Sequence, residues 1–264
     1  MPELTHQELT GDIIGAYYEV YNRTPRIYPE YIYEQAMIEE LRRRHRATTR
    51  QNEYRILYKE RLIGVQRLDL FVAEEVAVEI KVVEHLTPLH KAQGISYLKT
   101  VDKPVGLLLN FGGKTPEFCR LYLNPAKRAS ALPEKKAIVP APDWLYPELA
   151  HQVVGGLYEV HTVLGAGFVY RIYANASYHE LRLRGLPVKP GKRMQVTYKD
   201  VVVGDVAFAH IVVEGKIMVF PVAISDVNAL HLDSLKDWMR LCDIHLGILA
   251  NFDAISLEPV FIRA

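Results

Sequence analysis

The sequence predicts a mixed α/β fold that occurs twice along a chain of 264 residues. An internal repeat is the first observation: the segment IIGAYYEVY, which begins at Ile13, returns as VVGGLYEVH from Val153, a shift of 140 positions. Helical spacing of apolar residues at the start of each copy is the second observation, and strand-like alternation after it is the third. A shift this long repeats a whole domain, so both copies are expected to fold alike.

The same register continues through most of both copies. The matched pairs include Tyr33 with Tyr173, Glu40 with Glu180, Tyr58 with Tyr198, Lys59 with Lys199, and Gly64 with Gly204. After one inserted residue, the run LLLNF that ends at Phe111 meets GILANF, which ends at Phe252, and His90 meets His231. Chance would not keep one register over so much chain, and the sequence therefore predicts a tandem duplication.

Two domains are expected, at residues 1–123 and 148–264, joined by a linker at 124–147. The linker is rich in proline and carries several basic residues: Pro125, Lys127, Arg128, Pro133, Lys135, Lys136, Pro140, Pro142 and Pro147. Its prolines favour an extended, semi-rigid connection.

The elements of the first copy follow from periodicity. Apolar residues such as Ile13, Tyr17 and Tyr21 recur at helical spacing, and they predict helices at about residues 6–22 and 30–47. Runs rich in Val, Ile and Leu predict strands at about residues 53–58, 62–72 and 75–83. A helix to about residue 101, a buried strand in VGLLLNF and an edge strand in FCRLYL are expected next. The order of the core is helix, three strands, helix, strand, which forms a mixed central sheet flanked by helices.

Composition excludes several classes of protein. Apolar residues make up 49% and charged residues 24% of the chain, and these values are typical of a globular protein. The formal net charge of +1 is too small for a polycation that binds nucleic acid by bulk charge alone. Cys119 and Cys242 form no metal-ligand pattern. The sequence has no apolar run long enough for a membrane helix, and we expect a cytoplasmic location and no membrane partner.

Three ionic residues stand out in the predicted hairpin RLDLFVAEEVAVEIK, at 67–81. Glu79 and Lys81 point to the same side of their strand because side chains alternate. If the chain reverses around Glu74, Asp69 lies opposite Glu79, with the two residues roughly 5 Å apart. Paired carboxylates suit Mg²⁺, which binds one or two protein carboxylates and completes its shell with water and phosphate oxygens.

The same residues resemble the motif of the PD-(D/E)XK nuclease superfamily. Its members place a carboxylate on one core strand and (D/E)xK on the next, and Asp69, Glu79 and Lys81 match these positions. Gln93 and Tyr97 resemble the QxxxY motif of exonuclease branches. The resemblance implies two restriction-endonuclease-like domains. It also implies Mg²⁺ or Mn²⁺ bound by both carboxylates and the backbone carbonyl of Ile80, with Lys81 and Gln93 acting on water, metal or substrate.

Within the superfamily the chain looks most like the GxxExxY proteins. The first copy has Ile27, Glu30 and Tyr33 at the three motif positions, so the glycine is missing and the glutamate is present. Glu30 is therefore expected to be a further catalytic acid, in preference to Glu19. Glu19 has a counterpart in the second copy, Glu159, which favours a structural role for it.

The second copy departs from the motif throughout. Tyr170 replaces the motif glutamate, and the shift of 140 places Ala209, Val219 and Pro221 at the positions of the three ionic residues. None of these side chains can hold a metal ion or act on water. The second copy is expected to be a catalytically dead domain, and the fold itself does not require the ionic residues.

A basic run follows the second predicted helix, and contact with phosphate groups is its functional interpretation. Its members are Arg42, Arg43, Arg44 and Arg46, with Tyr97 as a further candidate for contact with nucleic acid. The alternative is a solvated helix end, where cations also interact favourably with the helix dipole.

The leading hypothesis is a metal-dependent nuclease that cleaves nucleic acid, with DNA as the expected polymer, using the first domain only. The alternative is a catalytically inactive module that binds nucleic acid or supports an assembly. The two repeats are further expected to form an intramolecular pseudo-dimer. The sequence leaves open whether the substrate is single-stranded, double-stranded or branched, and whether cleavage begins at ends.

Overall fold

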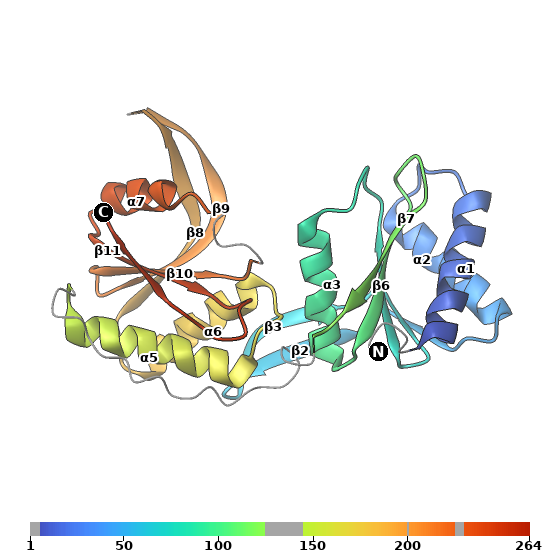
Figure 1. Ribbon diagram of the computed structural model, residues 1–264, viewed down its shortest axis with the longest axis horizontal. Coiled ribbons are helices and arrows are strands. Elements are labelled where there is room, and N and C mark those ends of the chain that lie inside the picture. The colour runs from blue at the N-terminus through green and yellow to red at the C-terminus, as the bar shows by residue number, and fades with distance from the viewer. Residues whose placement is uncertain (1–5, 125–144, 200, 225–229) are drawn as a thin grey trace. The chain divides into compact units, whose positions relative to one another are not determined.

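A computed structural model describes residues 6–124, 145–199, 201–224 and 230–264 (Figure 1). The chain forms two compact units. The first unit comprises residues 1–56 and 65–128, and the second comprises residues 57–64 and 129–264. The predicted linker at 124–147 lies almost wholly outside the described residues.

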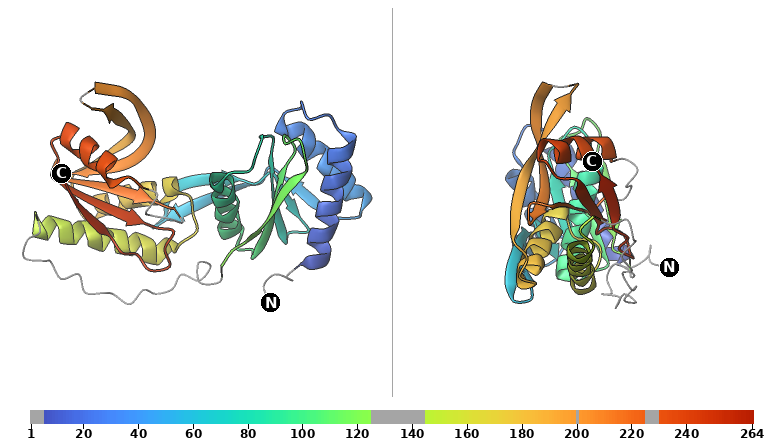
Figure 2. Two further views of the ribbon diagram at one scale, coloured as in Figure 1. Left: turned by 45° about the horizontal axis from the view of Figure 1, so that its top comes forward. Right: turned by 90° about the vertical axis from the view of Figure 1, so that its left-hand side faces the viewer.

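The first unit is a three-layer α/β/α structure. Its sheet has the strand order β1-β4-β5-β6-β7, with α1 and α2 on one face and α3 on the other (Figures 1 and 2). The elements in chain order are α1 (Gln7–Arg23), α2 (Glu30–Arg43), β1 (Thr48–Arg50), β2 (Glu53–Tyr58), β3 (Arg61–Arg67), β4 (Leu70–Val72), β5 (Val76–Lys81), α3 (Pro88–Val101), β6 (Val105–Asn110) and β7 (Glu117–Tyr122). Strands β2 and β3 form a separate two-stranded sheet.

Alternation along β5 divides its side chains between two cores. Val78 and Ile80 are buried with the apolar residues of α1 and α2. Ala77 faces the other core, where Leu98 of α3 and Leu108 of β6 are buried. Glu79 and Lys81 share the side of Ala77 by the same alternation. The two residues of the motif are therefore placed on the α3 side of the sheet.

The register of the β4–β5 hairpin matches the prediction from the sequence. Leu70 pairs with Val78 and Val72 with Val76, and the reversal is therefore centred on Glu74. Glu74 has a φ of 55°, a left-handed conformation that closes the tight turn. Strand β5 runs parallel to β6, whereas the other neighbours in the sheet are antiparallel. Continuing the hairpin register by one residue places Asp69 opposite Glu79.

The second unit repeats this architecture with the strand order β12-β11-β10-β9-β8. Its elements are α5 (Pro147–Leu164), α6 (Tyr170–Leu183), β8 (Val188–Tyr198), β9 (Val201–Val213), β10 (Ile217–Val222), α7 (Leu232–Leu241), β11 (Leu246–Asn251) and β12 (Val260–Arg263). Strands β10 and β11 are parallel, as β5 and β6 are in the first unit. The prediction of two mixed α/β domains with a flanked central sheet is confirmed.

The first copy differs from the expected elements around Asp69. The single strand predicted at 62–72 is wrong, because it is divided into β3 and β4, which belong to different sheets. The amide of Gln51 donates to the carbonyl of Asp69 over 3.0 Å, and Gln51 has a left-handed φ of 52°, which bends the strand pair at this point. The second predicted helix also ends early, at Arg43, and β1 follows it.

No helix in the described parts of the chain is long and apolar enough to cross a lipid bilayer.

Candidate active site

Asp69 lies at the bend between β3 and β4, where its carboxylate reaches the neighbouring strand. Its Oδ2 accepts a hydrogen bond from the amide of Ile80 over 2.8 Å. This amide belongs to the residue between Glu79 and Lys81, so the contact fixes Asp69 beside both of them. The bend in the strand pair thus orients the first carboxylate of the motif.

Glu79 and Lys81 are in direct contact on β5. The Nζ of Lys81 lies 2.5 Å from Oε1 of Glu79, and the Glu79 residue is only 3% exposed. The other carboxylate oxygen, Oε2 of Glu79, is buried and has no hydrogen-bond partner among the described residues. A buried carboxylate oxygen without a partner is costly for a folded protein, and a bound cation would satisfy it.

The pKa values show how strongly these groups interact. Burial and the neighbouring Asp69 raise the pKa of Glu79 to about 8, against the opposing effect of Lys81. Burial also raises the pKa of Asp69, although the Ile80 amide and Lys81 oppose this shift. Burial alone would lower the pKa of Lys81, but Glu79, Glu30 and Asp69 surround it and raise the pKa, so Lys81 is an ammonium at neutral pH.

Two glutamates of α2 approach the same site. Glu30 is the first residue of the helix, and its Oε1 accepts a long hydrogen bond of 3.4 Å from the amide of Val82, directly after Lys81. Glu34 lies one helical turn later and is buried, and its charge raises the pKa of Asp69. Its Oε2 accepts from Arg50 over 2.7 Å and from Gln51 over 2.9 Å.

Sequence reasoning missed Glu34, although two signals were present. It lies four residues after Glu30, so both carboxylates fall on one side of the helix. Ala174 occupies the matching position of the second copy, so Glu34 disappears together with the ionic residues of the motif.

Helix α3 contributes Gln93 and Tyr97 to the site. The Nε2 of Gln93 donates to the hydroxyl of Tyr97 over 2.6 Å. Burial and the charges of Glu79 and Asp69 raise the pKa of Tyr97 to about 12. Gln93 and Tyr97 are one turn apart on α3, and their bond joins the two residues that the QxxxY pattern selected.

The donor set fits a hard divalent cation of the magnesium type. Two carboxylates face one another, and one oxygen of Glu79 has no partner among the described residues. Across the described ranges, no group of three or more His, Cys, Asp or Glu residues has the arrangement of a metal site. A site with two carboxylates is nevertheless normal for Mg²⁺, because water and phosphate oxygens supply the remaining ligands.

The arginines of the basic run are paired with carboxylates of the same unit. Arg42 and Arg43 both contact Glu39, each with a shortest separation of 2.8 Å, and these pairs are exposed. Arg44 pairs with Glu40, and Arg46 pairs with Asp12 and Glu8. The four cations lie at and just beyond the C-terminal end of α2.

Among its described residues the second unit has no equivalent of the ionic site, but the residues at the matching positions differ from those predicted. Val219 pairs with Ile211, so the inserted residue precedes this hairpin and every position moves by one. Ala209, Val219 and Pro221 are therefore the wrong counterparts. The residues that correspond in register to Asp69, Glu79 and Lys81 are His210, Phe220 and Val222.

Apolar packing replaces the ionic site in the second unit. Phe220 and Val222 are buried in a core with Met239 of α7. His210 is buried too, with its Nδ1 3.1 Å from the carbonyl of Phe208, and burial lowers the pKa of His210. Two apolar residues and a neutral imidazole cannot reproduce the paired carboxylates.

Comparison with known families agrees with the fold. The sequence profile of the PD-(D/E)XK nuclease superfamily matches residues 7–121 and 147–264, one segment for each copy. The chain therefore belongs to the PD-(D/E)XK nuclease superfamily. No curated protein and no solved structure matches it.

Proposed function

We propose that the first unit is a metal-dependent nuclease that hydrolyses phosphodiester bonds in nucleic acid. The observation that supports this proposal most is the placement of the half-buried Asp69 beside the buried Glu79, with an oxygen of Glu79 that has no partner among the described residues. A domain does not keep such a costly arrangement for packing, since the second unit packs well with Phe220 and Val222 in its place.

The metal ligands in this proposal are the carboxylates of Asp69 and Glu79 and the carbonyl of Ile80. When bound, Mg²⁺ or Mn²⁺ supplies stabilisation of the charge on the scissile phosphate and lowers the pKa of a coordinated water. Asp69 is held for this task by its bond from the Ile80 amide. Glu30, at the start of α2, contributes further negative charge to the same site.

Lys81 orients the attacking water or a phosphate oxygen. Its pKa is raised, so at neutral pH it is a proton donor in hydrogen bonds and not a general base. Its position beside Glu79 keeps the ammonium close to the water or phosphate oxygen that this proposal places in the site. Gln93 positions Tyr97 through their hydrogen bond, and both side chains line the α3 side.

DNA is the proposed substrate, and the basic run is the proposed contact with its backbone. Arg42 and Arg43 are exposed and share one carboxylate, Glu39. Exposed ion pairs contribute little to stability, so a phosphate group can replace the carboxylate at small cost.

The test is cleavage of labelled single-stranded and double-stranded DNA and RNA with Mg²⁺ or Mn²⁺. Glu79→Gln and Lys81→Ala are expected to abolish cleavage of every polymer while circular dichroism shows an intact fold. His210→Gln is the matched control, because His210 is in the position of Asp69 in the second unit, and it should cut at the wild-type rate. Residual cleavage that is equal in wild type and both site variants would contradict the proposal.

A second candidate function is a nucleic-acid-binding module without hydrolysis. The observation that favours it is Ile27, which occupies the position of the motif glycine and is 82% exposed beside α2. This alternative predicts binding that survives chelation of metal, with no cleavage of any polymer. Metal-dependent cleavage that is lost in Glu79→Gln excludes it.

A further inference from the structure

The turn between β2 and β3 belongs to the second unit, where it is held on α5 and α6. The hydroxyl of Tyr58 donates to Oε2 of Glu180 over 2.8 Å. Lys59 pairs with Glu180 at 2.8 Å and with Glu159 at 3.2 Å. Tyr58 is fully buried by this contact.

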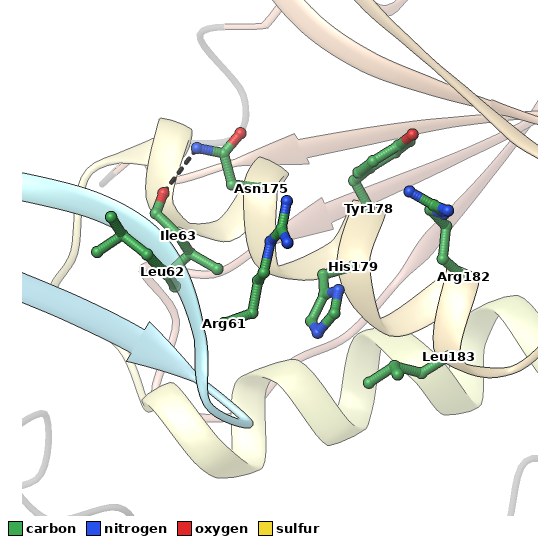
Figure 3. Close-up of a pocket in the computed structure, with 8 residues that line it drawn as sticks. All are labelled: Arg61, Leu62, Ile63, Asn175, Tyr178, His179, Arg182 and Leu183. Carbon is green, nitrogen blue, oxygen red and sulfur yellow. Dashed lines mark hydrogen bonds between the residues drawn. The ribbon is translucent and has the colours of Figure 1, made fainter.

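A backbone contact and a close approach complete the attachment of this turn. The Nδ2 of Asn175 donates to the carbonyl of Ile63 over 2.7 Å (Figure 3). Next to it, a Cβ on Gly64 would lie only 2.3 Å from Cδ1 of Ile172. The absence of a side chain at Gly64 therefore lets α6 approach the strand.

Every residue of this attachment has a counterpart after the shift of 140. On the turn, Tyr58, Lys59, Ile63 and Gly64 correspond to Tyr198, Lys199, Val203 and Gly204. On the helices, Glu159, Ile172, Asn175 and Glu180 correspond to Glu19, Ile32, Gln35 and Glu40. The chemistry is retained at each position: a phenol, an amine, a β-branched aliphatic residue and a glycine on one side, and two carboxylates, an isoleucine and an amide on the other.

The second turn, between β8 and β9, is uncovered. Tyr198 is 66% exposed and Val203 is 61% exposed, and the hairpin stands out from the body of the second unit (Figure 1). No heavy atom of the described residues lies within 4 Å of the position that a Cβ on Gly204 would take. Gly204 therefore has no packing role within the second unit that would require a glycine.

The matching helix surface of the first unit is uncovered as well. The Glu40 side chain is 20% exposed, whereas the Glu180 side chain is 3% exposed under the turn. Ile32 is partly exposed, although its counterpart Ile172 is buried. Gln35 is exposed and has an amide that can donate a hydrogen bond.

We propose that the β8–β9 turn of one chain docks on α1 and α2 of a second copy of this chain, with the contacts seen between the first turn and α6. Tyr198 and Lys199 then bind Glu40, and Lys199 also pairs with Glu19. Ile32 packs against Gly204, beside a hydrogen bond from Gln35 to the carbonyl of Val203.

This contact joins two different surfaces, so each chain offers one turn and one helix pair. Such a head-to-tail interface continues from chain to chain and produces either a closed ring or an open filament. It also covers Val203, as α6 covers its counterpart Ile63, and Val203 is part of an exposed apolar stretch on a long hairpin of the kind that favours non-specific aggregation.

The experiment measures the mass of the full-length chain by light scattering and sedimentation. Wild type is expected to form oligomers whose mass grows with protein concentration or stops at a ring. Gly204→Val should remain monomeric, because valine favours a strand and has free space in the isolated unit but clashes with Ile32 on docking. Ile32→Lys should be monomeric through loss of the helix surface. Val163→Lys, at an exposed apolar site on α5, is the control and should assemble like wild type.

Mixing the two monomeric variants distinguishes contact between chains from contact within one chain. Gly204→Val retains the helix surface and Ile32→Lys retains the turn, so the mixture is expected to form a 1:1 dimer and nothing larger. Wild type that stays monomeric at high micromolar concentration would overturn the proposal. Oligomers of unchanged mass in both variants, or a mixture that forms no dimer, would overturn it equally.

Discussion

Glu79 is the residue whose burial destabilises the metal-free site and whose carboxylate is the proposed metal ligand. Its Oε2 is buried without a partner among the described residues, and its pKa is raised to about 8 by burial and by Asp69. At neutral pH the metal-free site therefore holds a proton that a divalent cation would displace. The same burial that makes the carboxylate costly makes it a strong ligand once a cation is present.

The raised pKa of Glu79 predicts how the stability of the first unit depends on pH. A free glutamate has a pKa of about 4.3, so the folded state binds an extra proton between pH values of about 4.3 and 8. The free energy of unfolding falls as pH rises through this window, by up to about 1.4 kcal/mol per pH unit from this group. Glu79→Gln removes this loss. The difference in melting temperature between Glu79→Gln and wild type is therefore expected to increase in favour of the variant as the pH rises from 5 to 8.

Thermal melts at each pH, without metal, check this expectation. Glu39→Gln is the control, because hydrogen bonds from Arg42 and Arg43 lower the pKa of Glu39 to about 2 and its ionisation is complete throughout the same range. The melting curves of this control should follow wild type in parallel. A Glu79→Gln protein that loses stability with pH as steeply as wild type would show that the glutamate titrates normally.

At the scale of elements, the bend between β3 and β4 is a feature of the first unit that the second unit lacks at the matching strands β8 and β9. The first unit divides its hairpin at Gln51 and Asp69, whereas β8 and β9 continue as long strands whose register is irregular at two places, after Gly191 and after Val196. Glu34 of α2 accepts hydrogen bonds from Arg50 and Gln51 at this bend. The helix thus holds the bend that orients Asp69.

Glu34→Ala is expected to destabilise the first unit by about 1–3 kcal/mol, the usual cost of leaving buried partners unsatisfied. Because Asp69 then loses its fixed position, turnover should fall as well. Urea denaturation and cleavage assays at saturating metal measure the two effects. The exposed Glu53→Ala is the control for both. Full activity in Glu34→Ala would mean that the bend needs no support from α2.

The ion pairs at the C-terminal end of α2 lead to a prediction about the affinity for DNA. Glu39→Gln frees Arg42 and Arg43 from their carboxylate, so DNA should bind more tightly and its affinity should depend more steeply on salt. Arg42→Ala should have the opposite effect. Fluorescence anisotropy with labelled DNA across a salt series, with Glu79→Gln present to prevent cleavage, measures both. The exposed Arg240→Ala, on α7 of the second unit, is the matched control. Unchanged binding in the first two variants would exclude the basic run from the interface.

At the scale of the whole molecule, the chain is a duplicated member of the PD-(D/E)XK nuclease superfamily with one ionic site. Both units keep the layers and the parallel pair at the centre of the sheet. Where the first has Glu79 and Lys81, the second has Phe220 and Val222 in an apolar core with α7. The proposed assembly gives the second unit a role that does not depend on catalysis, since it carries the uncovered turn.

The sequence by itself determined the duplication, the two α/β folds and the pairing of Asp69 with Glu79. These features follow from patterns that lie along the chain: a constant shift, periods of two and 3.6 residues, and a hairpin whose centre fixes its register. Each pattern is carried by the order of residues along the chain, so it can be read without knowing how distant segments pack.

Only the tertiary structure decided which distant residues meet. It placed Glu34 beside Asp69 and raised the pKa of Glu79 by burial. It also showed that Phe220, and not Val219, is the counterpart of Glu79. After an insertion the register follows from strand pairing and not from a count of residues. Burial and charge depend on the packing of helices against both faces of the sheet, and no local pattern carries that information.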